Sequence, residues 1–214
     1  MEFDVPNPRT QDTREACFPT SLKIILEHLS QKQRNTKINL PLKRINKHCF
    51  YVRGVGVDIG DIEAGILSIN NDLKKFNYVV FEASGRNSDI NLLKQILNNP
   101  DSSAPIVFLG AEYFTEQIIG YEVPEIPEHD YEHTIIVRRI ADTEIVIYDP
   151  FKPFLEKSTR VPEIKTSIKI VNFLKYWSKA SNHIVWIQKI SSSNLPSLPP
   201  SQKSLSAYIP PNIK

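Results

Sequence analysis

A cysteine near the N-terminus has the setting of a thiol nucleophile. Residues 11–29 read QDTREACFPTSLKIILEHL, and Cys17 is followed by Pro19, a residue favoured in the first turn of a helix. A helix N-terminus offers a partial positive charge and free N–H groups, which favour a thiolate over a thiol. Gln11, six positions earlier, can supply a side-chain N–H to an oxyanion that forms beside the sulfur.

A histidine and an aspartate are expected to meet at one end of a β-hairpin. The strands EHTIIVRRI and TEIVIYDP are short and β-branched, and they flank a turn around Ala141 and Asp142. A two-residue turn sets His133 opposite Pro150, and a turn one residue longer sets His133 opposite Asp149. Both registers bring the imidazole and the carboxylate to the same end, and the second also puts them on the same face.

This pair suits a base and the group that orients it. A carboxylate that accepts from one ring nitrogen fixes the tautomer and stabilises the imidazolium. The other ring nitrogen can then take a proton from a nucleophile. The candidate constellation is therefore Cys17, His133 and Asp149, with Gln11 as an oxyanion donor.

These residues resemble the papain-like cysteine peptidases. The HTIIV and IVIYDPF segments are most similar to the bacteriocin-processing peptidases that remove leaders after a double glycine, and to their stand-alone relatives. The resemblance covers roughly residues 8 to 190. It implies a papain-like fold, Cys17 as nucleophile, His133 as general base and acid, Asp149 as orienter and Gln11 in the oxyanion hole.

The chain departs from that family just after the nucleophile. The leader peptidases usually have Gly or another small residue there, whereas this chain has Phe18 and Pro19. We expect a narrower substrate cleft, so specificity for Gly-Gly is not carried over. Coupling to export by an attached transporter is not carried over either.

The predicted elements place helices first and strands later, which gives an α+β class with a helical half packed on an antiparallel sheet. The helix at 17–31 is expected to be amphipathic, with Lys23, Glu27 and His28 on its solvent side. A polar linker leads to a second helix that begins near residue 61 and is capped by one of two aspartates, Asp58 or Asp61. Alternation and helical periodicity predict the remaining elements: strands at 78–84, 104–110, 132–140, 143–150 and 182–190, and helices at 89–99 and 171–180.

Length and composition favour one domain. The chain has 214 residues, and we assign residues 1–190 to a papain-like domain. Residues 191–214 are rich in Ser and Pro, which predicts a flexible or extended tail that offers a docking segment for a protein partner. Lys and Arg number 26 against 24 Asp and Glu, and the two signs are interspersed, so nucleic acid is not an expected partner.

The sequence also predicts a cytoplasmic protein without a cofactor. The start MEFDVPNPRT lacks the basic and apolar regions of a signal peptide, and no segment has the apolar length of a membrane span. A cytosolic chain keeps Cys17 and Cys49 reduced. No pair of CxxC motifs predicts zinc, and adjacent His48 and Cys49 do not readily share a metal. We therefore expect no metal or organic cofactor, and no membrane partner.

Three other histidines are less suited to the role of the base. His129 lies in EIPEHDYEH, an exposed acidic loop that would favour basic substrates if it overhangs the cleft. His183 begins the last strand and is expected to be structural, and His28 is expected to be solvated. RGVGVDIGDIE lacks the order of a phosphate-binding loop, so it is interpreted as a turn that enters a helix.

The pattern as a whole predicts a thiol hydrolase that cleaves a peptide or protein substrate through an acyl-enzyme. Two alternatives remain open at this point. The same triad supports acyl transfer, deamidation or transglutamination, since water or an amine can resolve an acyl-enzyme. A papain-like module that only binds a peptide or a protein is the other alternative, because Phe18 and Pro19 crowd the nucleophile.

Overall fold

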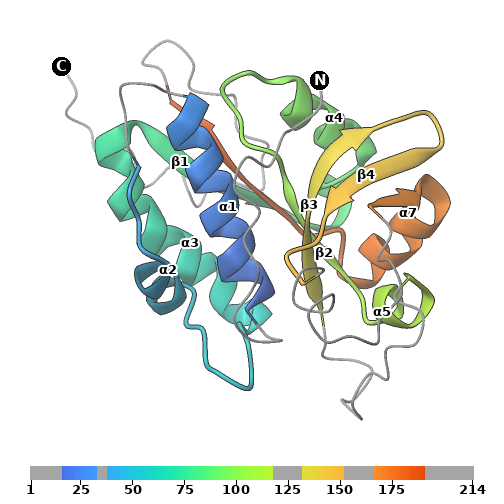
Figure 1. Ribbon diagram of the computed structural model, residues 1–214, viewed down its shortest axis with the longest axis horizontal. Helices are drawn as coiled ribbons and strands as arrows, with labels where there is room; N and C mark the ends of the chain where they lie inside the picture. The colour runs from blue at the N-terminus through green and yellow to red at the C-terminus, as the bar shows by residue number, and fades with distance from the viewer. Residues whose placement is uncertain (1–15, 33–37, 118–131, 152–165, 191–214) are drawn as a thin grey trace.

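A six-stranded antiparallel sheet forms the centre of the protein (Figure 1). The computed structural model describes residues 16–32, 38–117, 132–151 and 166–190. The strands lie in the order β1-β6-β2-β3-β4-β5, and every neighbouring pair is antiparallel. Their bounds are β1 Tyr78–Ala83, β2 Ile106–Leu109, β3 His133–Ile140, β4 Glu144–Tyr148, β5 Ser167–Lys169 and β6 Ile184–Lys189.

Helices cover both faces of this sheet (Figure 1). One face carries α1 (Cys17–Lys32), α2 (Leu42–His48) and α3 (Ile59–Leu73). The other face carries α4 (Ile90–Asn98), α5 (Glu112–Gln117) and α7 (Ile170–Lys179). Short 3₁₀ turns follow α3 and β1, at Lys74–Phe76 and Gly85–Asn87. No helix in the described ranges is long and apolar enough to cross a membrane.

The helices on both faces of the sheet explain why the central strands are apolar at nearly every position. Phe108 and Ile136 belong to the core beneath α1, whereas their neighbours Val107 and Ile135 belong to the core beneath α7. Since both faces are buried, the strands are continuous apolar runs in sequence. All four residues of β2 and the first five of β3 are buried.

The predicted α+β, papain-like class is confirmed, and most predicted elements are present. Helix α3 begins at Ile59, and the Asp58 carboxylate accepts from the Gly60 N–H at 2.7 Å, so Asp58 is the cap. Asp89 caps α4 in the same way, accepting from the Leu92 N–H at 2.8 Å. The short elements α2, α5 and β5 were not predicted, because three to seven residues carry too little periodicity.

The prediction that α1 has a solvent face is wrong. Lys23 is buried, its ammonium group donates to the Leu40 carbonyl at 2.9 Å, and it pairs with Glu27 at 3.2 Å. His28 is only 8% exposed, so it is not solvated as expected. The segment that leads into α2 covers the side of α1 that carries Lys23. Helix α1 is therefore buried both on its sheet side and on the side predicted to face solvent.

The predicted hairpin register is also wrong, by a small shift. Ala141 donates its N–H to the Glu144 carbonyl at 2.8 Å, so the tip of the turn is Asp142 and Thr143 rather than Ala141 and Asp142. The turn is one residue further along the chain than the sequence pattern indicated.

A β-bulge changes the alignment of the two candidate residues, His133 and Asp149. The register changes between Val137 and Arg139. One step beyond Ile136 and Tyr148, the last pair of the ladder, Asp149 comes opposite Ile135, two residues on from His133. Because strand residues alternate between faces, Asp149 and His133 lie on the same side of the sheet. Their expected meeting at one end of the hairpin is therefore present in a different register.

The side chain of Asn70 links helix α3 to the edge strand β1 by two hydrogen bonds. Asn70 is buried, its amide donates to the Val80 carbonyl at 3.1 Å, and its carbonyl accepts from the Val80 N–H at 2.7 Å. We expect Asn70→Ala to lower the free energy of unfolding by about 2 to 4 kcal/mol, because two buried backbone groups lose their partners.

The neighbouring Asn71 is exposed on the same helix and gives a matched control. Asn71→Ala should change stability by under about 0.5 kcal/mol in the same urea titration. Equal effects of the two substitutions would contradict this account of β1.

Candidate active site

Cys17 is the first residue of α1, and its side chain is turned into the protein. The residue is 7% exposed, and α1 packs against β3, the strand that begins with His133. Phe18 points away into the core, where its ring lies 5.3 Å from that of Phe108. The ring therefore packs between α1 and the sheet, and its position gives no support to the expected narrowing of the cleft.

His133 is fully buried and is held by a carboxylate and three aromatic rings. Its Nε2 lies 2.7 Å from Asp149 Oδ1. The Tyr113 ring is nearly parallel to the imidazole, at 10° and a centroid distance of 5.7 Å. Phe114 and Phe151 approach at 4.8 Å and 6.1 Å. The ring has little freedom to leave the geometry that the carboxylate sets.

Asp149 accepts hydrogen bonds at both carboxylate oxygens. Oδ1 accepts from the His133 ring and from the Phe151 N–H at 2.8 Å, and Oδ2 accepts from the Tyr113 hydroxyl at 2.9 Å. A buried carboxylate needs several donors to offset the loss of water. Tyr113 was missed by the sequence analysis, since an aromatic residue in a six-residue helix has no distinguishing pattern.

The environment favours a thiolate and an imidazolium. Burial alone would raise the pKa of Cys17, but interactions with His133 and with Thr134 lower it overall. Burial alone would lower the pKa of His133, but Asp149 and Cys17 raise it to about 10. His133 Nδ1 is buried without a hydrogen-bond partner among the described residues, so it is the ring nitrogen that can exchange a proton with the thiol.

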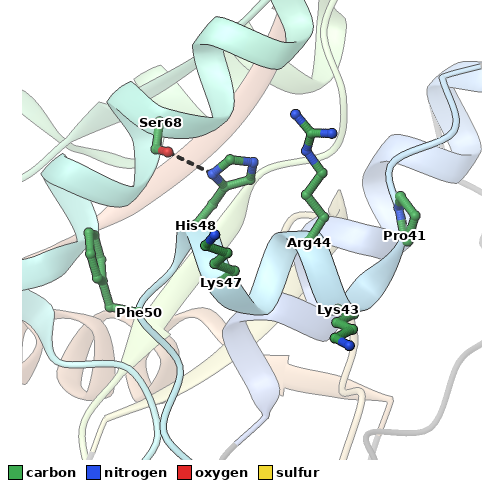
Figure 2. A pocket seen from close by; sticks show the side chains of 7 residues that line it. All are labelled: Pro41, Lys43, Arg44, Lys47, His48, Phe50 and Ser68. Carbon is green, nitrogen blue, oxygen red and sulfur yellow. Dashed lines mark hydrogen bonds between the residues drawn. The ribbon is translucent and has the colours of Figure 1, made fainter.

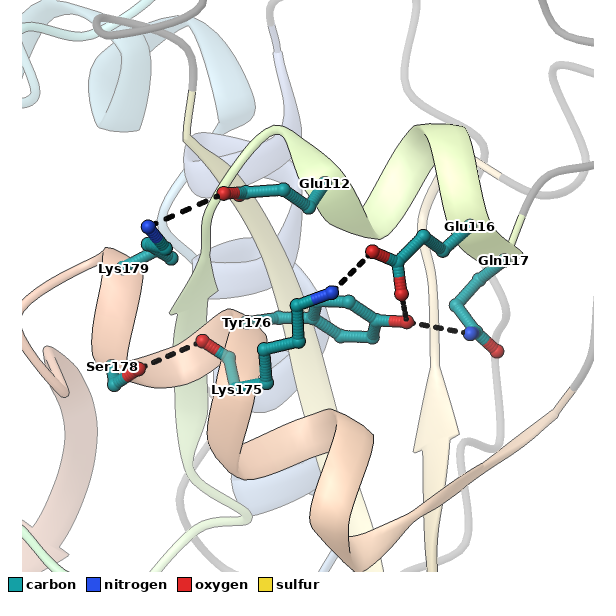
Figure 3. A network of polar contacts seen from close by, with 7 residues as sticks. All are labelled: Glu112, Glu116, Gln117, Lys175, Tyr176, Ser178 and Lys179. Atoms are coloured by element: carbon teal, nitrogen blue, oxygen red, sulfur yellow. Dashed lines mark hydrogen bonds and ion pairs between the residues drawn. The ribbon is translucent and has the colours of Figure 1, made fainter.

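Helix α5, which carries Tyr113 and Phe114, is fastened to α7 (Figure 3). Side chains from the two helices meet in a polar network. Its contacts are the Lys175–Glu116 ion pair, the Tyr176 hydroxyl donating to Glu116 at 2.8 Å, Gln117 donating to that hydroxyl at 2.7 Å, and Lys179 lying 3.8 Å from Glu112. The network sets the position of α5 and therefore of the ring that supports Asp149.

The turn between β2 and α5 depends on a glycine. Gly110 donates its N–H to the Tyr176 carbonyl at 3.0 Å. A Cβ at this position would lie 2.6 Å from the Cβ of Lys179 and 2.8 Å from Glu112 Oε2. Only glycine lets the turn approach α7 this closely.

The other cysteine, histidine and acidic residues singled out in the sequence have different surroundings. Cys49 is fully buried, and burial raises its pKa to about 12. His183 stacks on Phe108 at 4.4 Å. Glu132, next to His133, has a pKa that burial raises to about 7, partly offset by His183. No group of three or more His, Cys, Asp or Glu side chains in the described ranges could hold a metal ion.

Some predicted residues lie outside the described ranges. They are Gln11, His129, the acidic residues Glu125, Glu128 and Asp130, and the tail 191–214. Their assignments, and the domain boundary at residue 190, stay predictions.

The opposite pKa shifts of the two cysteines predict different reactivity. With iodoacetamide, we expect Cys17 to be labelled well below its ordinary thiol pKa of roughly 8.5, and Cys49 to stay unlabelled in the folded protein. His133→Ala should move the Cys17 profile to higher pH, because it removes the charge that stabilises the thiolate. Peptide mass mapping over a pH series measures the labelling of both cysteines. The same pH dependence of Cys17 labelling in the parent and in His133→Ala would contradict the ion pair.

The Tyr113 hydroxyl should matter more to stability than the Tyr176 hydroxyl, whose hydrogen bonds are only partly buried. Tyr113→Phe leaves Asp149 Oδ2 buried without its donor, and we expect a loss of about 1 to 3 kcal/mol in unfolding free energy. Tyr176→Phe is the control, because its partners Glu116 and Gln117 are accessible to water, and it should cost under about 1 kcal/mol. Thermal or urea unfolding compares them, and a larger loss in Tyr176→Phe would overturn the assignment.

Known proteins resemble this chain in structure but not detectably in sequence. No protein-family model matches the sequence, and no protein of curated function matches it significantly. A crystal structure described as that of a C39-like peptidase from Bacillus anthracis superposes with a TM-score of 0.57 at 14% identity, covering 89% of this chain and 98% of the other.

Two further structures are more distant. The peptidase domain of Streptococcus ComA, a bifunctional ABC transporter of a quorum-sensing pathway, gives a TM-score of 0.44 at 13% identity, covering 85% of this chain and 97% of that domain. A double glycine motif protease from an AMS/PCAT transporter, solved with its leader peptide, gives 0.44 at 11% identity, covering 88% and 94%. With the element order and the sheet described above, the first similarity identifies the architecture of this chain as the papain-like α+β fold of C39-like peptidases.

Proposed function

We propose that this protein is a cysteine peptidase that cleaves a peptide bond with Cys17, His133 and Asp149. One observation carries the proposal: the pKa of Cys17 is lowered although the residue is buried, and the first cause that lowers it is His133, itself paired with Asp149. Burial raises the pKa of an ordinary cysteine, as it does for Cys49. A thiolate kept beside an imidazolium is the resting state of a thiol nucleophile with its general acid.

In the proposed reaction, the Cys17 thiolate attacks the carbonyl carbon of the scissile bond. The oxyanion accepts hydrogen bonds from the backbone N–H of Cys17 and from the side chain of Gln11. His133 gives its proton to the leaving amine, and the acyl-enzyme is formed. His133 then takes a proton from water, which attacks the thioester, and the carboxylic acid is released as Cys17 leaves as the thiolate, so that the thiolate and the imidazolium are restored. Asp149 keeps the ring in one tautomer and stabilises its charge throughout.

The position of Phe18 bears on the non-catalytic alternative. That alternative depended on Phe18 and Pro19 crowding the nucleophile, but the Phe18 ring is only 3% exposed and packs on Phe108. This ring therefore gives no support to the non-catalytic alternative. Acyl transfer to an amine uses the same steps up to the acyl-enzyme, and the product distinguishes it from hydrolysis.

The test uses a diverse peptide mixture and product analysis by mass spectrometry. We expect the parent protein to release fragments whose summed mass exceeds the substrate by one water. Cys17→Ala and His133→Ala should each lower the rate by at least about 1,000-fold.

Cys49→Ala is the matched control, because it removes the other thiol, and it should retain turnover once folding is verified. Turnover that survives without Cys17 would overturn the proposal. A product that carries an added amine instead of water would reassign the reaction to acyl transfer.

A further inference from the structure

A pocket of about 640 Å³ lies between α2 and α3, in the helical layer that also contains α1 (Figure 2). Its volume is within the range of pockets that hold small organic ligands, roughly 300 to 1,000 Å³. Seven residues line it: Pro41, Lys43, Arg44, Lys47, His48, Phe50 and Ser68. Cys17, His133 and Asp149 are not among them, so the pocket is separate from the candidate active site.

The lining is strongly cationic. Lys43, Arg44 and Lys47 are exposed, and no lining residue is acidic. Arg44, Lys47 and His48 share one side of α2, since they are three and four positions apart. Neither lysine makes an ion pair with a residue in the described ranges, so their charge is open to a ligand.

The one carboxylate nearby is already engaged. Asp72 Oδ1 lies 2.5 Å from Arg44 Nη2, and Oδ2 lies 2.8 Å from His48 Nε2. Burial acts to raise the pKa of Asp72, but its hydrogen bonds with His48 and Arg44 lower it overall. Asp72 therefore fixes Arg44 and His48 in place and leaves the lysines uncompensated.

A serine hydroxyl that is engaged with His48 completes the polar part of the pocket. Ser68 Oγ on α3 lies 2.6 Å from His48 Nδ1, and Figure 2 shows the ring turned toward it. Serine, histidine and aspartate in this order resemble a nucleophile and its base. However, Ser68 is inside α3, where backbone N–H groups bond within the helix, so no backbone oxyanion hole faces it. The arrangement is suited to binding rather than to catalysis.

An aromatic ring is held at the pocket wall at a cost to the backbone. Phe50 has φ of 53°, a left-handed conformation that is unfavourable for a bulky side chain. Its ring lines the pocket and is 49% exposed. A large apolar ring left in water beside a cationic cluster offers a surface for a planar apolar group.

We propose that this pocket binds a phosphate monoester attached to a planar ring, with the phosphate on Lys43 and Lys47 and the ring on Phe50. A phosphate group fits better than a carboxylate because its three terminal oxygens can accept from several cations at once. This site does not depend on the proposed peptidase activity.

Binding of phenyl phosphate, followed by amide chemical shifts of the parent protein, tests the proposal. We expect saturable shifts on α2 and α3, with weaker binding of inorganic phosphate and of benzoate, since each lacks one of the two recognised groups. Lys43→Gln/Lys47→Gln should weaken binding of phenyl phosphate on the order of tenfold.

Two controls locate the effect. Lys94→Gln/Lys169→Gln changes the net charge equally at exposed positions outside the pocket, and it should leave binding unchanged. Phe50→Asn keeps a residue type that tolerates the left-handed backbone, and it should reduce phenyl phosphate to the affinity of inorganic phosphate. AMP and phosphotyrosine as further probes distinguish a nucleotide from a phosphorylated side chain.

Three results would overturn the proposal. They are the absence of saturable shifts with phenyl phosphate, equal affinity in Lys43→Gln/Lys47→Gln and the parent, and benzoate binding as tight as that of phenyl phosphate. The amide spectrum of each variant verifies that it is folded before titration.

Discussion

The buried pair of His133 and Asp149 is the constraint on which the site depends. Removing a carboxylate and an imidazolium from water costs several kcal/mol unless each charge finds partners. Asp149 has three donors, at distances of 2.7 to 2.9 Å, and His133 has a carboxylate on one side and a thiol on the other. The charges are therefore stable only when the hairpin, α1 and α5 are all in place. A partly assembled site would leave a charge buried without a partner.

This requirement explains why the site is built from both helical layers. Helix α1 delivers Cys17 from one layer, and α5 delivers Tyr113 and Phe114 from the other (Figure 1). The sheet between them supplies His133 at the first position of β3. The ion pairs that fasten α5 to α7 are largely exposed, so each adds little stability. Their contribution is geometric, since they restrict where the Tyr113 hydroxyl can lie.

The sequence was sufficient for the features that local chemistry determines. Pro19 marks the start of α1, Asp58 caps α3, and two β-branched runs around a short turn predict the hairpin. Each signal depends on a few neighbouring residues, so it does not change with the tertiary packing around it. These signals also placed His133 and Asp149 at one end of the same hairpin.

Features that depend on distant packing could not be predicted. The bulge in β3 near Val137 has no residue signature, and it changed the register by which Asp149 reaches His133. Lys23 looks like a solvent-facing residue, but its partner is the carbonyl of Leu40, seventeen positions away. Tyr113 acts across thirty-six positions on Asp149. In each case the decisive contact joins segments whose proximity is known only from the fold.

The two cysteines show what a long-range contact adds to a side chain. Both are buried, so desolvation acts on both thiols in the direction that disfavours the thiolate. For Cys49, burial is the only cause, and its pKa is raised to about 12. For Cys17, the interactions with His133 and Thr134 together outweigh burial, and the pKa is lowered instead. Burial and residue type are therefore shared, and the difference in chemistry comes from these neighbours, above all from an imidazole whose charge is in turn stabilised by Asp149. A search for reactive thiols by exposure alone would rank these residues together, whereas the partner of each sulfur separates them.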